Sequence, residues 1–121
     1  MTRYALSLAL ALGISLSSRS QATIKPEEAI NHVGDSVKVC GKIYGGIYLE
    51  NAKGQPTLLN MGGTYPNAPL TVVIWPDLRT KLNYKPEEKL KDKEVCVTGK
   101  VTLYKEKAQI VITNSEQIKE P

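Results

Sequence analysis

The sequence predicts a small all-β domain, and three observations lead to that fold class. Apolar and polar residues alternate with a period of two over several stretches, as they do in strands that bury one face. Five such stretches are separated by turn signals rich in Gly, Pro and Asn. Helical segments precede the first strand and lie between the third and the fourth. This order matches a five-stranded OB-fold Greek-key barrel with a short N-terminal helix and a helical connector between strands 3 and 4.

Residues 1–22 are predicted to be a secretory signal peptide, which leaves residues 23–121 as a single domain. Arg3 gives a positive start, residues 4–16 form an apolar run, and Ser20-Gln21-Ala22 is a small-x-small cleavage site. The apolar run is too short to span a bilayer, and an uncleaved N-terminal anchor is the alternative. We therefore expect cleavage after Ala22, a secreted or periplasmic protein and no membrane span.

The charge of the chain permits a polyanionic partner without demanding one. The sequence has 16 basic and 12 acidic side chains, and both Arg3 and Arg19 would leave with the signal peptide. The mature domain would then be only slightly basic, so its net charge decides little between classes of partner.

The first strand of the predicted barrel follows a short helix. Pro26-Glu27-Glu28 combines a proline suited to the first turn with two acidic residues, and Gly34 ends this helical segment. Residues 37–44 then alternate as a strand with Val37, Val39 and Ile43 on one face. The Gly45-Gly46 pair is expected to break the strand, and residues 47–50 resume it.

The middle of the chain supplies two more strands and the connector. The predicted order is a turn over 51–54, a strand over 57–61, a loop over 62–69, a strand over 70–75 and short helices over 77–82 and 85–90. Trp75 ends a β-branched run, and we expect it to pack in the core. The lysines of the connector alternate with acidic residues, which indicates a solvated face.

The last hairpin has the clearest alternation. Residues 94–104 form one predicted strand, residues 105–107 turn, and residues 108–113 return as the fifth strand. Gly41 and Gly99 interrupt the first and fourth strands, where a barrel needs residues that tolerate a sharp bend.

The two cysteines, Cys40 and Cys96, are predicted to form a disulfide, with free thiols as the alternative. Each has the strand parity opposite to that of its neighbouring valines, so both side chains point away from the barrel interior. The first and fourth strands of an OB-fold are antiparallel neighbours, which makes a cross-strand bond geometrically reasonable. Metal binding by the pair is disfavoured because the chain lacks further ligands at suitable spacing.

Several stretches read together carry a resemblance to known proteins. They are 24–29 before Val33-Gly34, 37–43, 59–67 running into 71–74, 97–101 with Tyr104-Lys105, and 109–111 before 115–118. On these the mature chain resembles small secreted bacterial OB-fold domains, found alone or attached to extracellular nucleases. The Leu-Asn-x-Gly loop that ends in Tyr-Pro-Asn is the most specific stretch. The resemblance implies nucleic-acid binding, although Glu106 replaces a common glycine and the cysteine pair is an addition.

No catalytic or metal site can be recognised in the sequence. His32 is the only histidine and lies near the end of the short helix, while the acidic pairs at 27–28 and 87–88 suit helix starts. Gly62-Gly63 lacks the Lys-Ser/Thr that a P-loop requires. We expect no catalytic activity, no metal and no cofactor.

A binding function has more candidates, because an OB-fold can pair a cationic groove with aromatic platforms for the bases of single-stranded nucleic acid. The candidate residues are Lys42, Tyr44, Tyr48, Tyr65, Asn67, Lys100, Tyr104, Lys105 and Lys107. Tyrosines at strand ends also suit a purely structural role, and the Tyr65-Pro66 loop suits a ring that pins the loop to the barrel. The alternatives are a protein-interaction module serving a secreted or envelope enzyme, or an oligosaccharide-binding domain.

Overall fold

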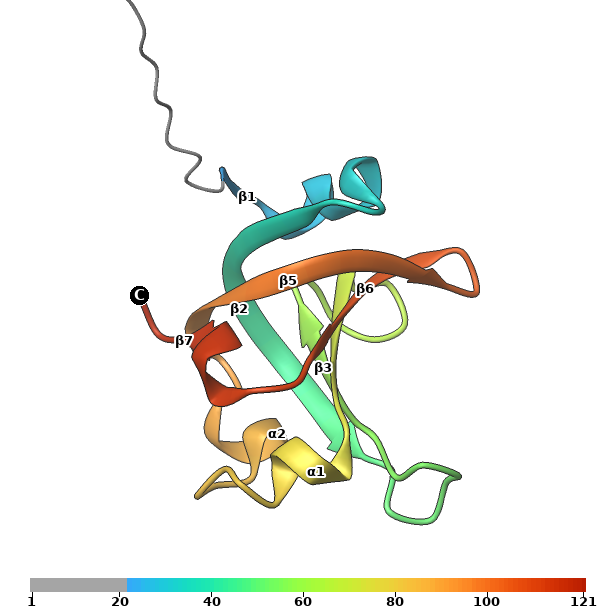
Figure 1. Ribbon diagram of the computed structural model, residues 1–121, viewed down its shortest axis with the longest axis vertical. Helices are drawn as coiled ribbons and strands as arrows, with labels where there is room; N and C mark the ends of the chain where they lie inside the picture. The colour runs from blue at the N-terminus through green and yellow to red at the C-terminus, as the bar shows by residue number, and fades with distance from the viewer. Residues whose placement is uncertain (1–21) are drawn as a thin grey trace, which may run out of the picture.

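A closed five-stranded barrel forms the body of the molecule, as predicted. The computed structural model describes residues 22–121, so all of the predicted signal peptide except Ala22 lies outside the described residues. The barrel strands are β2 (Ser36–Tyr48), β3 (Thr57–Met61), β4 (Leu70–Ile74), β6 (Lys107–Ile112) and β5 (Glu94–Tyr104), in that spatial order. Pairing of β2 with β5 closes the barrel (Figure 1).

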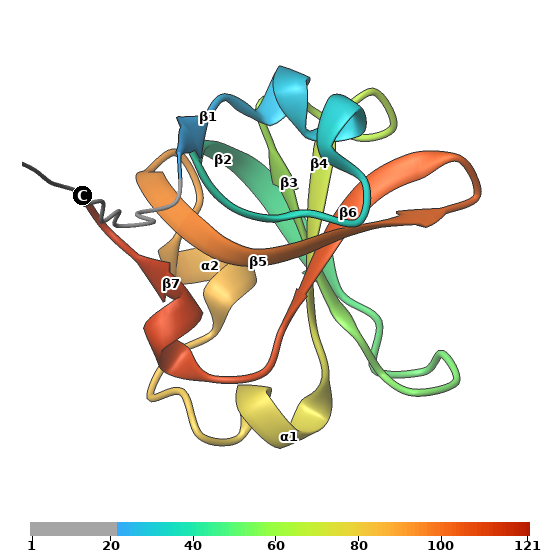
Figure 2. The same cartoon turned by 45° about the horizontal axis from the view of Figure 1, so that its top comes forward.

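Short elements cover the two ends of the barrel (Figures 1 and 2). The 3₁₀ helix η1 (Pro26–His32) lies over one end, where a short helix is predicted. At the other end, α1 (Pro76–Arg79) and α2 (Pro86–Lys89) form the connector and are shorter than predicted. None of the helices described for residues 22–121 has the length and apolarity that a membrane crossing needs.

Three small elements are absent from the sequence expectations. The strand β1 (Thr23–Ile24) pairs in parallel with β2, and β7 (Ile118–Lys119) pairs antiparallel with β5. The 3₁₀ turn η2 (Ser115–Gln117) precedes β7. Segments of two or three residues are too short to carry a periodic signal, and only their pairing identifies them.

The strand alternation predicted from the sequence produces the core. On β5, Val95, Val97 and Val101 are buried, while Cys96, Thr98 and Lys100 face outward and are half-buried or exposed. Buried side chains from the other barrel strands complete this core, including Val39, Ile43, Leu59, Met61, Leu70, Val72, Ile74, Ile110 and Ile112. The inner face is therefore filled by aliphatic side chains, and binding chemistry belongs to the outer surface.

The predicted break of the first strand at Gly45-Gly46 is wrong. β2 continues through both glycines to Tyr48, and its pairing with β3 shifts by one residue between Ile43 and Gly45. Gly45 has a φ of 144°, a backbone conformation that side chains other than hydrogen rarely allow. The glycine pair thus marks a β-bulge inside one long strand, because a bulge and a strand end share the same residue signal.

The predicted disulfide is confirmed. Cys40 and Cys96 are direct cross-strand partners on β2 and β5 and are bonded to each other. Both are half-buried on the outward side, while the adjacent Val39 and Val97 are fully buried. The bond joins segments 56 residues apart and links the two longest strands of the barrel.

Candidate nucleic-acid interface

The hairpin between β5 and β6 projects from one end of the barrel. Lys105 and Glu106 form its two-residue turn with φ values of 50° and 68°, both positive as a type I′ turn requires. Tyr104 and Lys107 flank the turn as direct strand partners. The strand β6 therefore begins one residue earlier than predicted, and the turn carries Glu106 where the resemblance favours glycine.

The loop 62–69 lies beside this hairpin. The Nζ atom of Lys107 donates a hydrogen bond to the carbonyl oxygen of Pro66 at 3.1 Å. The ring of Tyr65 is on the surface at 81% exposure, and Tyr104 is 60% exposed. The expectation that the Tyr65 ring pins its loop to the barrel is therefore wrong, because the ring lies in solvent. The loop is held instead by the hydrogen bond from the Lys107 side chain to the backbone carbonyl of Pro66.

These contacts bring five candidates to one place, which we call the hairpin cluster. It consists of Tyr65, Asn67, Tyr104, Lys105 and Lys107, and the members come from the loop 62–69 and from the β5–β6 hairpin. All five are exposed. The Nζ atom of Lys105 lies 5.4 Å from the centroid of the Tyr104 ring, so cation and ring stay adjacent without burial.

Lys42 and Tyr44 form a second group on β2. The Nζ atom of Lys42 lies 4.8 Å from the Tyr44 ring centroid and 4.0 Å from Oδ1 of Asp92. Tyr44 is 38% exposed at the bulge. This group is thus less open than the hairpin cluster, and part of its positive charge faces a carboxylate.

A row of polar side chains crosses the outer face between these two groups. Strand register aligns Gly45 with Asn60, Asn60 with Thr71, Thr71 with Gln109, and Gln109 with Thr102. Apart from Leu103 next to Thr102, their strand neighbours lie in the core, so the alternation turns this row outward. We call Asn60, Thr71, Gln109 and Thr102 the polar row; sequence reasoning missed it because only the register aligns residues from separate strands.

Lys100 extends this surface along β5. It is exposed and shares a strand face with Thr102 and Tyr104, two and four residues further on. The polar row therefore has cations and rings at both ends. Lys42 and Tyr44 lie at the β2 end, and Lys100 and the hairpin cluster lie at the β5 end.

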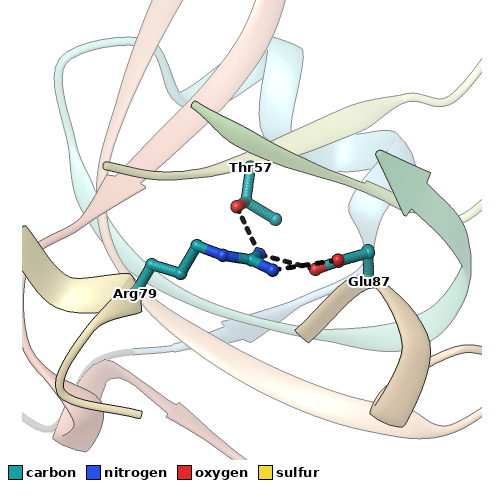
Figure 3. A network of polar contacts seen from close by, with 3 residues as sticks. All are labelled: Thr57, Arg79 and Glu87. Carbon is teal, nitrogen blue, oxygen red and sulfur yellow. Dashed lines mark hydrogen bonds and ion pairs between the residues drawn. The ribbon is translucent and has the colours of Figure 1, made fainter. Parts of the chain in front are cut away.

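Tyr48 lies apart from the other candidates, at the opposite end of the barrel. The guanidinium carbon of Arg79 lies 3.7 Å from the centroid of its ring, which covers that face of the ring. Arg79 also donates to Thr57 Oγ1 at 2.8 Å and to both carboxylate oxygens of Glu87, at 2.7 and 3.1 Å (Figure 3). We call Tyr48, Thr57, Arg79 and Glu87 the closed-end cluster.

Burial makes the closed-end cluster structural in character. The side chains of Arg79 and Glu87 are each 13% exposed, and Thr57 is fully buried. The hydrogen bonds from Arg79 lower the pKa of the Glu87 carboxyl, against the opposing effect of burial, and the same pair raises the pKa of Arg79. Sequence reasoning assigned Glu87 to a helix start only, because its partner lies on another helix, α1.

Trp75 is not a core residue, contrary to expectation. β4 ends at Ile74, and Trp75 follows it at 43% exposure, directly before α1. Its indole ring lies against Gly54 in the turn between β2 and β3, where an added Cβ would stand 2.9 Å from Cζ3 of the ring.

The single histidine in the sequence lies close to a carboxylate. His32 Nδ1 lies 3.3 Å from Oδ2 of Asp35 on an exposed turn. Within residues 22–121, no group of three or more His, Cys, Asp or Glu side chains is placed to hold a metal ion.

Comparisons with known proteins support the fold of the barrel. No family model matches the chain, and no curated protein matches it. Among solved structures, it is similar to a protein from Leishmania major Friedlin named as an aspartyl-tRNA synthetase, with a TM-score of 0.53 and 11% identity. The match covers 92% of this chain and 23% of the synthetase chain. The chain therefore spans less than a quarter of that neighbour, and the likeness shows an OB-like fold.

Proposed function

We propose that this protein is an exported, non-catalytic domain that binds single-stranded nucleic acid, or another extended polyanion, through the hairpin cluster and the polar row. The observation that carries the proposal is that two segments with exposed tyrosine rings, Tyr65 and Tyr104, are joined through Lys107 at one end of the barrel, where Lys105 lies beside Tyr104. A ring that already stacks inside the protein has no free face for a base, whereas these two rings are mostly in solvent.

The chemistry of the cluster suits a single strand. Bases stack on exposed aromatic rings with little regard to sequence, while lysines neutralise the phosphates that follow the strand. A duplex keeps its bases paired and stacked, so it offers the rings nothing comparable. The half-buried amides and hydroxyls of the polar row add hydrogen-bonding groups along the path.

Other features support the individual parts of this proposal. The solved neighbour is named as a tRNA synthetase, an enzyme class that acts on a nucleic acid. The disulfide agrees with an oxidising compartment, and the predicted signal peptide supplies the route to it. The only histidine is engaged with Asp35 on the surface, which favours binding over catalysis.

Titration of the oxidised domain with fluorescein-labelled single-stranded DNA and RNA of 12 nucleotides tests the proposal. With the lysines at 100, 105 and 107 on phosphates, we expect log K to fall with log salt at a slope of about −2. The double variant Lys105→Gln/Lys107→Gln should reduce the magnitude of this slope by about 1.4. The matched control, Lys81→Gln/Lys85→Gln on the exposed connector, should leave it unchanged. Absence of binding at low salt would contradict the proposal.

A protein-interaction module is the second candidate, and exposed aliphatic residues favour it. Ile30 and Val33 are 47% and 44% exposed beside the hairpin, and Leu103 is 50% exposed on β5. Backbone hydrogen bonds from Gly34 N to Val101 O and from Val101 N to Asp35 O hold the turn after η1 against β5. Recovery of an envelope protein by the wild type and not by Leu103→Ser, with no nucleic-acid binding, would favour this candidate.

A further inference from the structure

On the outer face of the barrel, the side chains change from polar to apolar between the polar row and the closed end. The next row toward the closed end contains only aliphatic side chains, because register aligns Ile47 with Leu58, Leu58 with Val73, and Val73 with Val111. Ile47 is 53% exposed at its edge, while Val73 at its centre is buried without belonging to the core cluster. We call these four residues the apolar row.

Trp75 lies one step further along the same face. It follows Val73 by two residues, so it continues the outward side of β4, and Ile74 before it is in the core. Gly54 supports its ring from the β2–β3 turn and has a φ of 83°. The ring is therefore held by backbone packing while 43% of the residue remains in solvent.

The charges around Trp75 differ from those of the hairpin cluster. Asp77 is exposed two residues after Trp75, while Glu50 and Lys53 are exposed in the β2–β3 connection that also contains Gly54. Attraction to phosphate is therefore weak here, and apolar contact with flat ring faces is the interaction that these residues can offer. The outer face thus has a half with several lysines and a half with an aliphatic row and few cations.

We infer that Trp75 is a second stacking platform, and that a bound single strand runs from the hairpin cluster across both rows to this ring. The inference rests on the proposed function and extends its site to the far edge of the sheet. Parallel register aligns Ile74 with Ile112, so Trp75 is level with Thr113, six residues along from Lys107. At a strand rise of about 3.3 Å per residue, the path is about 20 Å long.

This geometry predicts a minimum ligand length. A strand must be several nucleotides long, on the order of four or more, to reach both platforms. Shorter oligonucleotides should bind at the hairpin cluster alone, where the lysines are. Ligand length therefore separates the two halves of the face.

Intrinsic fluorescence offers the test, because Trp75 is the only tryptophan in the chain. The wild-type oxidised domain is titrated with unlabelled oligothymidylates of three and twelve nucleotides, and binding is followed independently by anisotropy of labelled versions. We expect the longer strand to quench Trp75 at saturation and the shorter one to leave its emission unchanged. This measurement needs no variant and does not depend on how a substitution folds.

Substitution sharpens the same test. Trp75→Leu should weaken binding of the longer strand about tenfold and leave the shorter one unaffected, since one stacked base is lost. Trp75→Phe, which retains a ring, should recover most of that loss, and Lys81→Ala on the exposed connector serves as the control. Unfolding midpoints of all variants exclude a folding defect as the cause.

The outcomes separate the two proposals. Saturable anisotropy with unchanged Trp75 emission, or an equal effect of Trp75→Leu on both lengths, overturns the second platform and leaves the hairpin site standing. No binding of either strand at low salt overturns the proposed function and the second platform together.

Discussion

The two ends of the barrel contain the same kind of pair in opposite surroundings. At the hairpin end, Tyr104 stands beside Lys105 with its side chain largely in solvent. At the closed end, Tyr48 lies under Arg79, which also bonds Glu87 and the buried Thr57. A tyrosine next to a cation therefore has no fixed meaning: burial and additional partners make one pair structural, and their absence leaves the other open to a ligand.

The disulfide joins β2, which carries Tyr48, to β5, which carries Tyr104, and its removal should have the largest effect. Cys40→Ala/Cys96→Ala opens a loop between residues 56 apart, so the unfolded chain gains entropy. We expect a loss of about 4 kcal/mol in the free energy of unfolding. Urea denaturation of the oxidised wild type and the double variant measures it. A loss below about 1 kcal/mol would show that β2 and β5 stay together without the bond.

Arg79→Ala should have the next largest effect, confined to stability. It leaves the carboxylate of Glu87 and the hydroxyl of Thr57 without their donor in a poorly hydrated place, at a cost of about 3 kcal/mol. Denaturant unfolding gives this value, and Lys81→Ala on the same connector is the control, with a change within about 0.5 kcal/mol. An equally small change for Arg79→Ala would remove the distinction between the two ends.

Replacing each of the two tyrosines by alanine compares the two ends directly. Tyr48→Ala should cost about 2 kcal/mol of stability and leave affinity for single strands unchanged. Tyr104→Ala should change stability by less than about 0.5 kcal/mol and weaken binding about tenfold, through loss of one stacked base. Paired unfolding and anisotropy measurements on both variants test this. The reverse pattern would assign binding to the closed end.

Acid should act on the closed end, with the smallest effect of the series. Hydrogen bonds from Arg79 place the pKa of Glu87 in the folded state below its value in the unfolded chain. The unfolded state therefore binds the proton first, and the stabilisation present above about pH 4.3 is lost as pH falls through the lowered pKa. Stability of Glu87→Gln should depend less on pH in this range. Identical pH profiles for wild type and variant would contradict this assignment.

Sequence reasoning succeeded where the signal is local or periodic. The alternation in 94–104 predicts β5, and the opposite parity of Cys40 and its neighbouring valines predicts an outward disulfide. It failed where the outcome depends on partners from distant segments. Gly45-Gly46 fits a strand end as well as a bulge, and only pairing with β3 distinguishes them.

The same limit applies to the candidate site. The position of Tyr104, Lys105 and Lys107 at the last hairpin was predictable from the alternation and the turn signal, but the exposure of the Tyr104 ring was not. The position of Tyr48 was not, because Arg79 reaches it from α1, and the exposure of Trp75 was not, because a β-branched run before it is typical of a buried strand. Where strand register or a distant partner decides the role of a side chain, local sequence patterns cannot predict that role.

Amide chemical-shift mapping of the oxidised domain during titration with a single-stranded 12-mer tests the central claim most directly. We expect the largest shifts in the loop 62–69 and at residues 100–107, decreasing with salt in parallel with the affinity. Shifts centred on α1 and α2 with none at the hairpin, or no shifts at low salt, would contradict the assignment of binding to the hairpin end of the barrel.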